Sequence, residues 1–233
     1  MKGILRRILA ALGRDLFVQY RARYVLTAVL ALGVWSAALR FSPDASGYVL
    51  APAFLFLNTF LVVFSLGLRQ AVCERQDGIL AALDLTPLRP HEFLAARGAS
   101  LGLIAAVQNP LIALAAGKPV ASWTSLMAGV CGEAAILSLA AFLVMAYAPP
   151  GRVIIGRFAA SFLLLGPPLM PFLGFVPGGW LILHPLQGPL LLFQGAFFPL
   201  PGRTFAMAVA ASGIWAALLL VACRKAFLRL REN

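Results

Sequence analysis

One long polar stretch interrupts an otherwise apolar chain, and it reads ERQDGILAALDLTPLRPHEF over residues 74–93. Four of the eight acidic residues of the chain lie in it, together with several arginines. Leucine and isoleucine recur at helical spacing inside the stretch until Pro87 and Pro90 end the pattern. The pattern predicts a short helix at a water-exposed surface, with an apolar face that can bind another protein.

The rest of the chain has the composition of a membrane protein. Of its 233 residues, 61% are hydrophobic, and the mean hydropathy is +0.91, which excludes an ordinary soluble domain. The net charge of +11 comes from basic residues at the edges of apolar runs, so we expect a topological role for this charge and no binding of nucleic acid. The three cysteines share no metal or redox spacing, and we expect no metal site.

Six apolar runs have lengths near that needed to cross a hydrocarbon core of roughly 30 Å at about 1.5 Å per residue. We expect them to form membrane-spanning helices over residues 24–39, 49–68, 98–117, 123–147, 153–173 and 205–223. The predicted fold class is therefore all-α integral membrane, with a single six-span transmembrane domain over residues 23–233.

The first 22 residues predict a different kind of helix. Leu5, Leu9 and Leu16 fall on one helical face, whereas Arg6 and Arg14 lie mostly opposite. Such a helix lies along the surface of anionic lipid and does not cross the membrane. Residues 1–22 are therefore predicted to form an N-terminal amphipathic interfacial helix.

The distribution of basic residues predicts the orientation. With a cytoplasmic N-terminus, 16 of the 19 Lys and Arg residues lie on the cytoplasmic side, and only Arg40, Lys118 and Arg203 lie outside. This asymmetry is strong, and an even number of spans returns the C-terminus to the cytoplasm. We expect a multi-pass protein of a bacterial-type inner membrane, with residues 69–97 as a cytoplasmic loop.

Proline and glycine interrupt the segment between the last two expected spans. Residues 166–204 hold eight of the 16 prolines, yet the segment stays apolar. Broken backbone at membrane depth is tolerated only where protein or a cavity satisfies its polar groups. We expect re-entrant or interfacial helices on the outer side over residues 174–204. A seventh span is disfavoured because it would put the basic C-terminus outside.

Motifs for catalysis are absent from the sequence. The chain has no G-x-x-x-x-G-K-[ST], H-E-x-x-H or G-x-S-x-G motif, and the expected topology separates its two histidines. We therefore expect no catalytic residues and no cofactor bound by this chain. Any dependence on ATP must come from another protein.

Glu133 is the only acidic residue expected well inside a span. An intramembrane carboxylate is costly and is a functional candidate by default. It could line a substrate path or respond to protons, it could be neutral and hydrogen-bonded to another span, or it could pair with Arg40. Asn58, Gln108 and Asn109 are further candidates for a polar substrate path, and they could equally join helices by hydrogen bonds.

The polar stretch resembles the cytoplasmic loop between the second and third spans of ABC-2 type transporter permeases. That loop carries Glu-Arg, then any two residues and a Gly, a leucine-rich turn and finally Ser/Thr-Pro. Two positions depart from the family pattern, because Ile79 replaces the usual Thr and Ala81 stands where an acid often follows. The resemblance assigns the contact with an ATPase to Glu74, Arg75, Asp77, Gly78, Leu80, Leu83, Asp84, Thr86 and Pro87.

The resemblance extends over the whole chain, from the amphipathic helix to the broken outer segment. It implies the permease subunit of an ATP-binding-cassette exporter that moves a small amphipathic or lipophilic substrate. Two such permeases, with 12 spans in total if each has the six predicted, would pair with two ATPase subunits that hold ATP and Mg. Small drug-export permeases are the nearest match, and the heme-exporter B subunits are a neighbouring family.

A proton-coupled secondary transporter that uses Glu133 is the alternative. It would need no ATPase, and the two halves of the chain would form an internal repeat. No clear repeat is visible, and the halves differ greatly in proline content.

Overall fold

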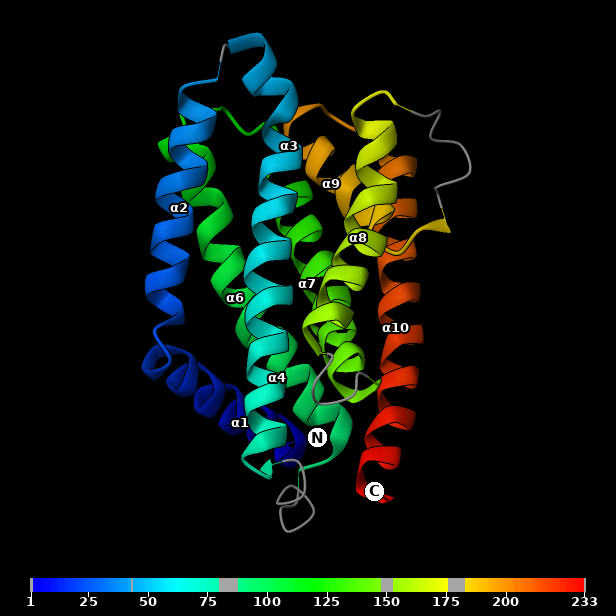
Figure 1. Ribbon diagram of the computed structural model, residues 1–233. Helices are drawn as coiled ribbons and strands as arrows, with labels where there is room; N and C mark the ends of the chain where they lie inside the picture. The colour runs from blue at the N-terminus through cyan, green and yellow to red at the C-terminus, as the bar shows by residue number, and fades with distance from the viewer. Residues whose placement is uncertain (1, 43, 80–87, 148–152, 176–182, 233) are drawn as a thin grey trace.

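The computed structural model describes residues 2–42, 44–79, 88–147, 153–175 and 183–232. These residues form helices joined by short connections, and no strand occurs among them (Figure 1). The helices are α1 (Lys2–Arg21), α2 (Tyr24–Arg40), α3 (Asp44–Phe60), the π-helical turn η1 (Leu61–Ser65), α4 (Leu66–Gln76), α6 (Pro90–Ala115), α7 (Trp123–Tyr147), α8 (Val153–Phe172), α9 (Gln187–Phe197) and α10 (Gly202–Glu232).

Four helical segments are long and apolar enough to cross a membrane alone. They are Val49–Gln76, Pro90–Ala115, Trp123–Tyr147 and Gly202–Arg229. The all-helical membrane class is thus confirmed, but the count of six spans stays a prediction. The 17 residues of α2 reach only about 25 Å, and α2 qualifies only together with α1 across a bend of 70°. The apolar described part of α8, Ala159–Phe172, is also short.

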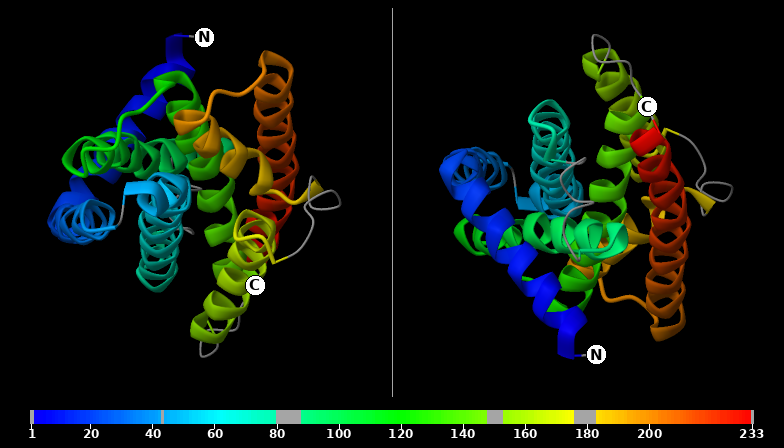
Figure 2. Two further views of the ribbon diagram at one scale, coloured as in Figure 1. Left: turned by 90° about the horizontal axis from the view of Figure 1, so that it is seen from above. Right: turned by 90° about the horizontal axis from the view of Figure 1, so that it is seen from below.

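The helices of the bundle run along a common direction, with α1 lying across one end (Figure 1). The start of α1, the end of α4 and the end of α10 all lie at that end. Seen along the bundle, α7 lies between other helices (Figure 2), and it packs against α3, α4, α6, α9 and α10. A central position explains why α7 shows no polar face in the sequence, because a helix that is covered all round is apolar all round.

Small residues let α6 and α7 approach closely. A Cβ atom at Gly98 would lie 2.9 Å from the Ser138 hydroxyl, and one at Gly102 would lie 3.3 Å from the Ala134 side chain. Small residues at the contact replace the hydrophobic driving force that helices in lipid lack. This contact fixes α6 against the centre of the bundle.

The short helix α9 lies within residues 174–204, where short helices are expected. It packs against α3, α7 and α10. A carbonyl group in its last turn accepts hydrogen bonds from outside the helix. The backbone N–H groups of Ala121 and Ser122 donate to the Ala196 carbonyl at 2.7 and 3.1 Å. The end of α9 therefore has its Ala196 carbonyl satisfied by protein, the condition for irregular backbone within a membrane.

A glycine at the start of α9 permits its contact with α10. A Cβ atom at Gly188 would lie 2.7 Å from the Ala208 carbonyl oxygen and 2.8 Å from the Ser212 hydroxyl. We predict that Gly188→Ala destabilises the protein by about 1–3 kcal/mol, because backbone must move to admit the methyl group. The measurement is the thermal unfolding midpoint of the detergent-purified chain.

Gly213→Ala is the matched control, since a Cβ atom at Gly213 of α10 would have no atom of another residue within 4 Å. Alanine is a better helix former than glycine by about 1 kcal/mol, so the control should keep or raise the midpoint. Equal midpoints for the two variants would contradict the assigned α9–α10 contact.

Candidate functional site

The amphipathic helix α1 buries two polar side chains of its second half, whereas Arg6 and Arg14 are exposed. Asp15 and Gln19 are 3% and 1% exposed, whereas Leu5, Phe17 and Tyr20 are largely exposed. The helix packs mainly against α6, and its apolar side faces outward, where lipid can solvate it. Polar side chains are therefore the most deeply buried residues of α1.

Arg97 is the centre of a buried cluster that joins α1, α4 and α6. Its side chain is almost fully buried, its Nη2 donates to the Glu74 carboxylate, and its Nε lies 3.7 Å from the Asp15 carboxylate. The guanidinium also lies over the Phe93 ring, 4.8 Å from the centroid. One cation thus bridges two carboxylates that come from different helices.

Amide and hydroxyl groups extend this cluster on one side. The Gln19 side-chain amide donates to Ser100 Oγ at 2.8 Å and to Gln70 Oε1 at 3.3 Å. Gln70 in turn approaches Glu74 Oε1 at 3.5 Å, and Ser100 donates to the Arg97 carbonyl at 2.9 Å. We call the set the ion cluster, and its members are Asp15, Gln19, Gln70, Glu74, Arg97 and Ser100.

A second ion pair fastens the other end of α1 to the start of α6. Arg7 donates from Nε and Nη2 to the two oxygens of Glu92 at 3.0 and 2.6 Å. Glu92 also accepts the Arg89 backbone N–H at 3.0 Å, which caps the first turn of α6. This two-point contact is the strong form of an Arg–carboxylate pair.

Electrostatics explains why Arg97 is essential to the arrangement. Burial raises the pKa of the Asp15 carboxyl group, and the nearby Arg97 guanidinium opposes that rise. Burying charges costs several kcal/mol per ion, and only close partners repay it. The ion cluster therefore holds together only when all three helices are in place.

The residues expected to contact an ATPase fall partly beside this cluster. Glu74 is a buried member of it, and Arg75 donates to the Met145 carbonyl of α7 at 3.0 Å. Asp77 follows the last residue of α4, and Gly78 has a left-handed φ of 69° that ends the helix. The remaining residues assigned to this contact lie outside the described residues, and they are Leu80, Leu83, Asp84, Thr86 and Pro87. Their role stays a prediction.

A second set of polar residues is buried halfway along the bundle. Asn58 donates to Asn109 Oδ1 at 2.8 Å, Asn109 donates to Thr59 Oγ1 at 2.6 Å, and Thr59 donates to the Leu55 carbonyl at 3.1 Å. We call Asn58, Thr59, Asn109 and Glu133 the central polar cluster. The bonds between α3 and α6 are of the kind that joins helices in a membrane.

Glu133 of α7 faces this cluster and is fully buried. Its carboxyl group interacts with the Thr59 hydroxyl, although neither carboxylate oxygen has a partner at hydrogen-bond geometry among the described residues. No ion pair to Glu133, from Arg40 or any other base, occurs in that part of the chain. An ionised Glu133 would therefore lack a counter-ion, an arrangement that is costly at membrane depth.

Gln108, the fourth residue expected along a substrate path, lies apart from the central polar cluster. Its side-chain amide donates to the Ala28 carbonyl of α2 at 2.8 Å. Like Asn58, Asn109 and Glu133, it is buried among helices. A transport role for these four residues stays a prediction.

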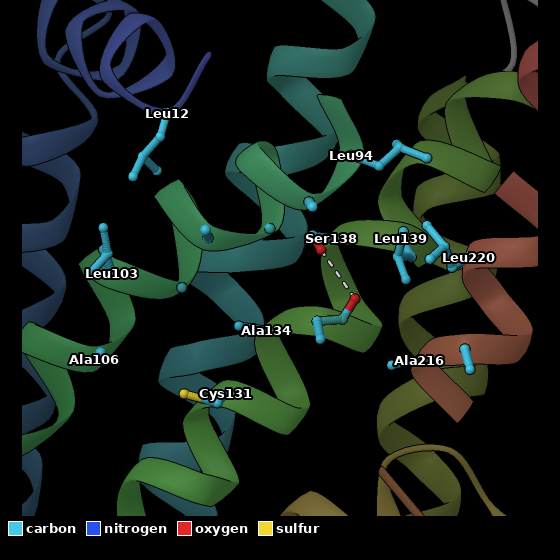
Figure 3. Close-up of a pocket in the computed structure, with 16 residues that line it drawn as sticks. Leu12, Leu94, Leu103, Ala106, Cys131, Ala134, Ser138, Leu139, Ala216 and Leu220 are labelled. Carbon is cyan, nitrogen blue, oxygen red and sulfur yellow. Dashed lines mark hydrogen bonds between the residues drawn. The ribbon is translucent and has the colours of Figure 1, made fainter. Parts of the chain in front are cut away.

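An apolar groove of about 680 Å³ lies between α1, α6, α7 and α10 (Figure 3). Small side chains such as Ala134 and Ala216 form its walls, and Leu12 of α1 closes one end. Ser138 is its polar residue, and its hydroxyl already donates to the Ala135 carbonyl at 3.1 Å. None of the four expected substrate-path residues lines this groove.

Sequence reasoning did not identify Asp15, Gln19, Gln70 and Ser100 as site residues. A signal was present, because Asp15 and Gln19 are four residues apart on one face of α1, as are Gln70 and Glu74 on α4. In the same described part of the chain, no group of three His, Cys, Asp or Glu residues could hold a metal ion.

Comparison with known proteins points to export. The chain is 28% identical over 195 residues to a fluoroquinolones export permease protein of Mycobacterium tuberculosis, in strain CDC 1551 / Oshkosh and equally in strain ATCC 25618 / H37Rv. The match covers 82% of this chain and 81% of each relative. No protein-family model matches the chain. The relatives confirm the resemblance to drug-export permeases, and with the apolar helices they indicate a multi-pass membrane protein.

Two substitutions separate the roles of the charges in the ion cluster. We predict that Arg97→Gln destabilises the protein by about 3–5 kcal/mol, because it leaves Glu74 and Asp15 buried without their cation. Asp15→Asn should cost about 1 kcal/mol or less, because Arg97 keeps Glu74 and its Nε atom lies 3.7 Å from Asp15 Oδ2, too far for a strong hydrogen bond. Thermal unfolding in detergent measures both. A larger loss from Asp15→Asn than from Arg97→Gln would contradict this assignment.

Proposed function

We propose that this chain is the permease subunit of an ATP-binding-cassette exporter. It would move a small amphipathic or lipophilic substrate, of which fluoroquinolones are the example named by its relatives. ATP and Mg would be held by a separate ATPase subunit, since the chain has no P-loop motif. A second permease copy would complete the transporter, which would have no catalytic residue in this chain.

The observation that carries the proposal is the position of the ion cluster. It joins the end of α4 and the start of α6, and these are the two helices that flank the loop resembling an ATPase-binding segment. It also ties both helices to α1. A force applied to this loop would therefore reach three helices together rather than bend one of them.

Association with an ATPase is the first test. The tagged full-length chain should co-purify with a P-loop ATPase in a fixed ratio, and substitutions in the polar stretch of residues 74–93 should release it. Purification of a transport-competent chain without any ATPase would overturn the proposal.

Substitutions at the end of α4 should uncouple ATP hydrolysis from transport. We predict that Gly78→Val and Asp77→Arg each lower substrate-stimulated ATP turnover several-fold while the chain stays in the membrane. Valine at a left-handed φ costs about 1–2 kcal/mol, and it would redirect the chain as it leaves α4. No atom of the described residues lies within 4 Å of a Cβ atom at Gly78, so the expected cause is backbone strain. Measurements are ATPase activity and substrate uptake by inverted vesicles.

Arg203→Glu is the control for charge reversal. Arg203 is exposed at the start of α10, at the opposite end of the bundle from α4 (Figure 1). This variant should keep normal ATP turnover. If Gly78→Val and Asp77→Arg match it in turnover and transport, the polar stretch does not couple this chain to an ATPase.

Glu133 is buried with no partner at hydrogen-bond geometry among the described residues, and this favours a second candidate, a proton-coupled transporter. Glu133→Gln keeps the shape of the side chain and removes the titratable group. We predict that transport by this variant still depends on ATP and changes by less than about threefold between pH 6 and pH 8, because an ATP-driven permease needs no proton at this position. Uptake driven by a pH gradient alone, and lost in Glu133→Gln, would instead establish proton coupling.

A further inference from the structure

Arg157 is a charged residue inside an apolar helix. It lies one turn after the start of α8, whose sequence VIIGRFAASFLLL is otherwise free of charge. Its side chain is exposed on the surface of the bundle. An ionised side chain within a span is costly and marks a functional position by default.

The guanidinium of Arg157 is directed across to another helix. Its Nη2 donates to the Ser65 hydroxyl at 2.9 Å, and Ser65 is the last residue of the π-helical turn η1. Single π-helical turns inside α-helices occur frequently at functional sites. Ser65 lies one turn before Arg69 and eleven residues before the end of α4, and α4 ends at the end of the bundle that carries α1 (Figure 1).

The charge of Arg157 is not neutralised within the described residues. The ion pairs formed there are those of Arg7 and Arg97, and none of the carboxylates in that part of the chain lies within ion-pair distance of Arg157. A guanidinium carries five N–H donors in a fixed planar fork, and the contact with Ser65 uses one. The side chain of Arg157 is exposed, and Leu61, one turn before Ser65, is 46% exposed.

We propose that Arg157, oriented by Ser65, binds the carboxylate or phosphate group of an amphipathic molecule. The guanidinium fork matches both anions at two points, and the apolar surface around Leu61 suits the hydrophobic part of the same molecule. The occupant is a lipid headgroup or the anionic group of a transported amphiphile. Binding of a transported amphiphile rests on the proposed function as an exporter, whereas the existence of the anion site does not.

The test measures binding without any ATPase. The purified chain is reconstituted in nanodiscs of phosphatidylcholine, and equilibrium binding of radiolabelled dodecanoate and dodecyl phosphate is compared with that of dodecyltrimethylammonium. Both anions should bind more tightly than the cation. Arg157→Gln should weaken anion binding about tenfold or more, the scale of a charge-assisted two-point contact, and should leave binding of the cation unchanged.

Three further variants separate charge from geometry. Arg157→Lys keeps the charge without the fork and should retain an intermediate affinity. Ser65→Ala leaves the charge but frees the guanidinium, and should weaken binding a few-fold. Arg224→Gln removes an exposed cation from α10, another helix, and should bind like the wild type. Anion affinity that is the same in the wild type, Arg157→Gln and Ser65→Ala overturns the proposal.

Added phosphatidylglycerol distinguishes the two sources. If it displaces dodecanoate from the wild type but not from Arg157→Gln, the site holds a lipid headgroup. If dodecanoate binding that depends on Arg157 persists in phosphatidylglycerol, the site takes a free amphiphile. The binding assay contains no nucleotide or ATPase. A negative result would therefore overturn the anion site without affecting the exporter proposal, which is tested by ATP turnover.

Discussion

Burial of the Arg97 guanidinium is the constraint on which this end of the molecule depends. A buried cation needs close counter-charges, and the two that surround it come from Asp15 of α1 and Glu74 of α4. If α1 or α4 moved away from α6, Arg97 would lose one of the two carboxylates that balance its buried charge. Charge pairing thus contributes directly to the position of the N-terminal helix.

The burial of polar side chains of α1 and the exposure of its apolar ones are explained by lipid as the solvent. In water an amphipathic helix docks through its apolar side, but lipid solvates that side as well as protein does, so polar groups supply the preference for protein contact. The outward position of Phe17 and Tyr20 and the burial of Gln19 fit this rule. Deeper in the bundle, the same rule explains the hydrogen bonds that join Asn58, Thr59 and Asn109.

The sequence predicts local features well because they depend on short-range patterns. The amphipathic pattern over residues 1–22 predicts α1, and the apolar run over residues 123–147 matches the bounds of α7. The ion cluster could not be predicted in this way, since Asp15 and Arg97 are 82 residues apart and their partnership depends on how α1 turns against α6. The π-helical turn also has no local signal, because Leu61–Ser65 reads like any apolar helix. The count of six spans stays a prediction, because α2 passes the test of length and composition only together with α1, across a bend of 70°.

The long helix that runs through α3, η1 and α4 connects the two polar clusters. Asn58 and Thr59 anchor it before the π-helical turn, and Gln70 and Glu74 anchor it after the turn. Hydrogen bonds strained by an insertion make a π-helical turn the place where a long helix bends most easily. Under the proposed function, a displacement of α4 by an ATPase would therefore be taken up at η1 before it broke either cluster. Ser65, which closes that turn, is also the residue that holds Arg157, so a bend at η1 would reorient the guanidinium and change its hold on a bound anion.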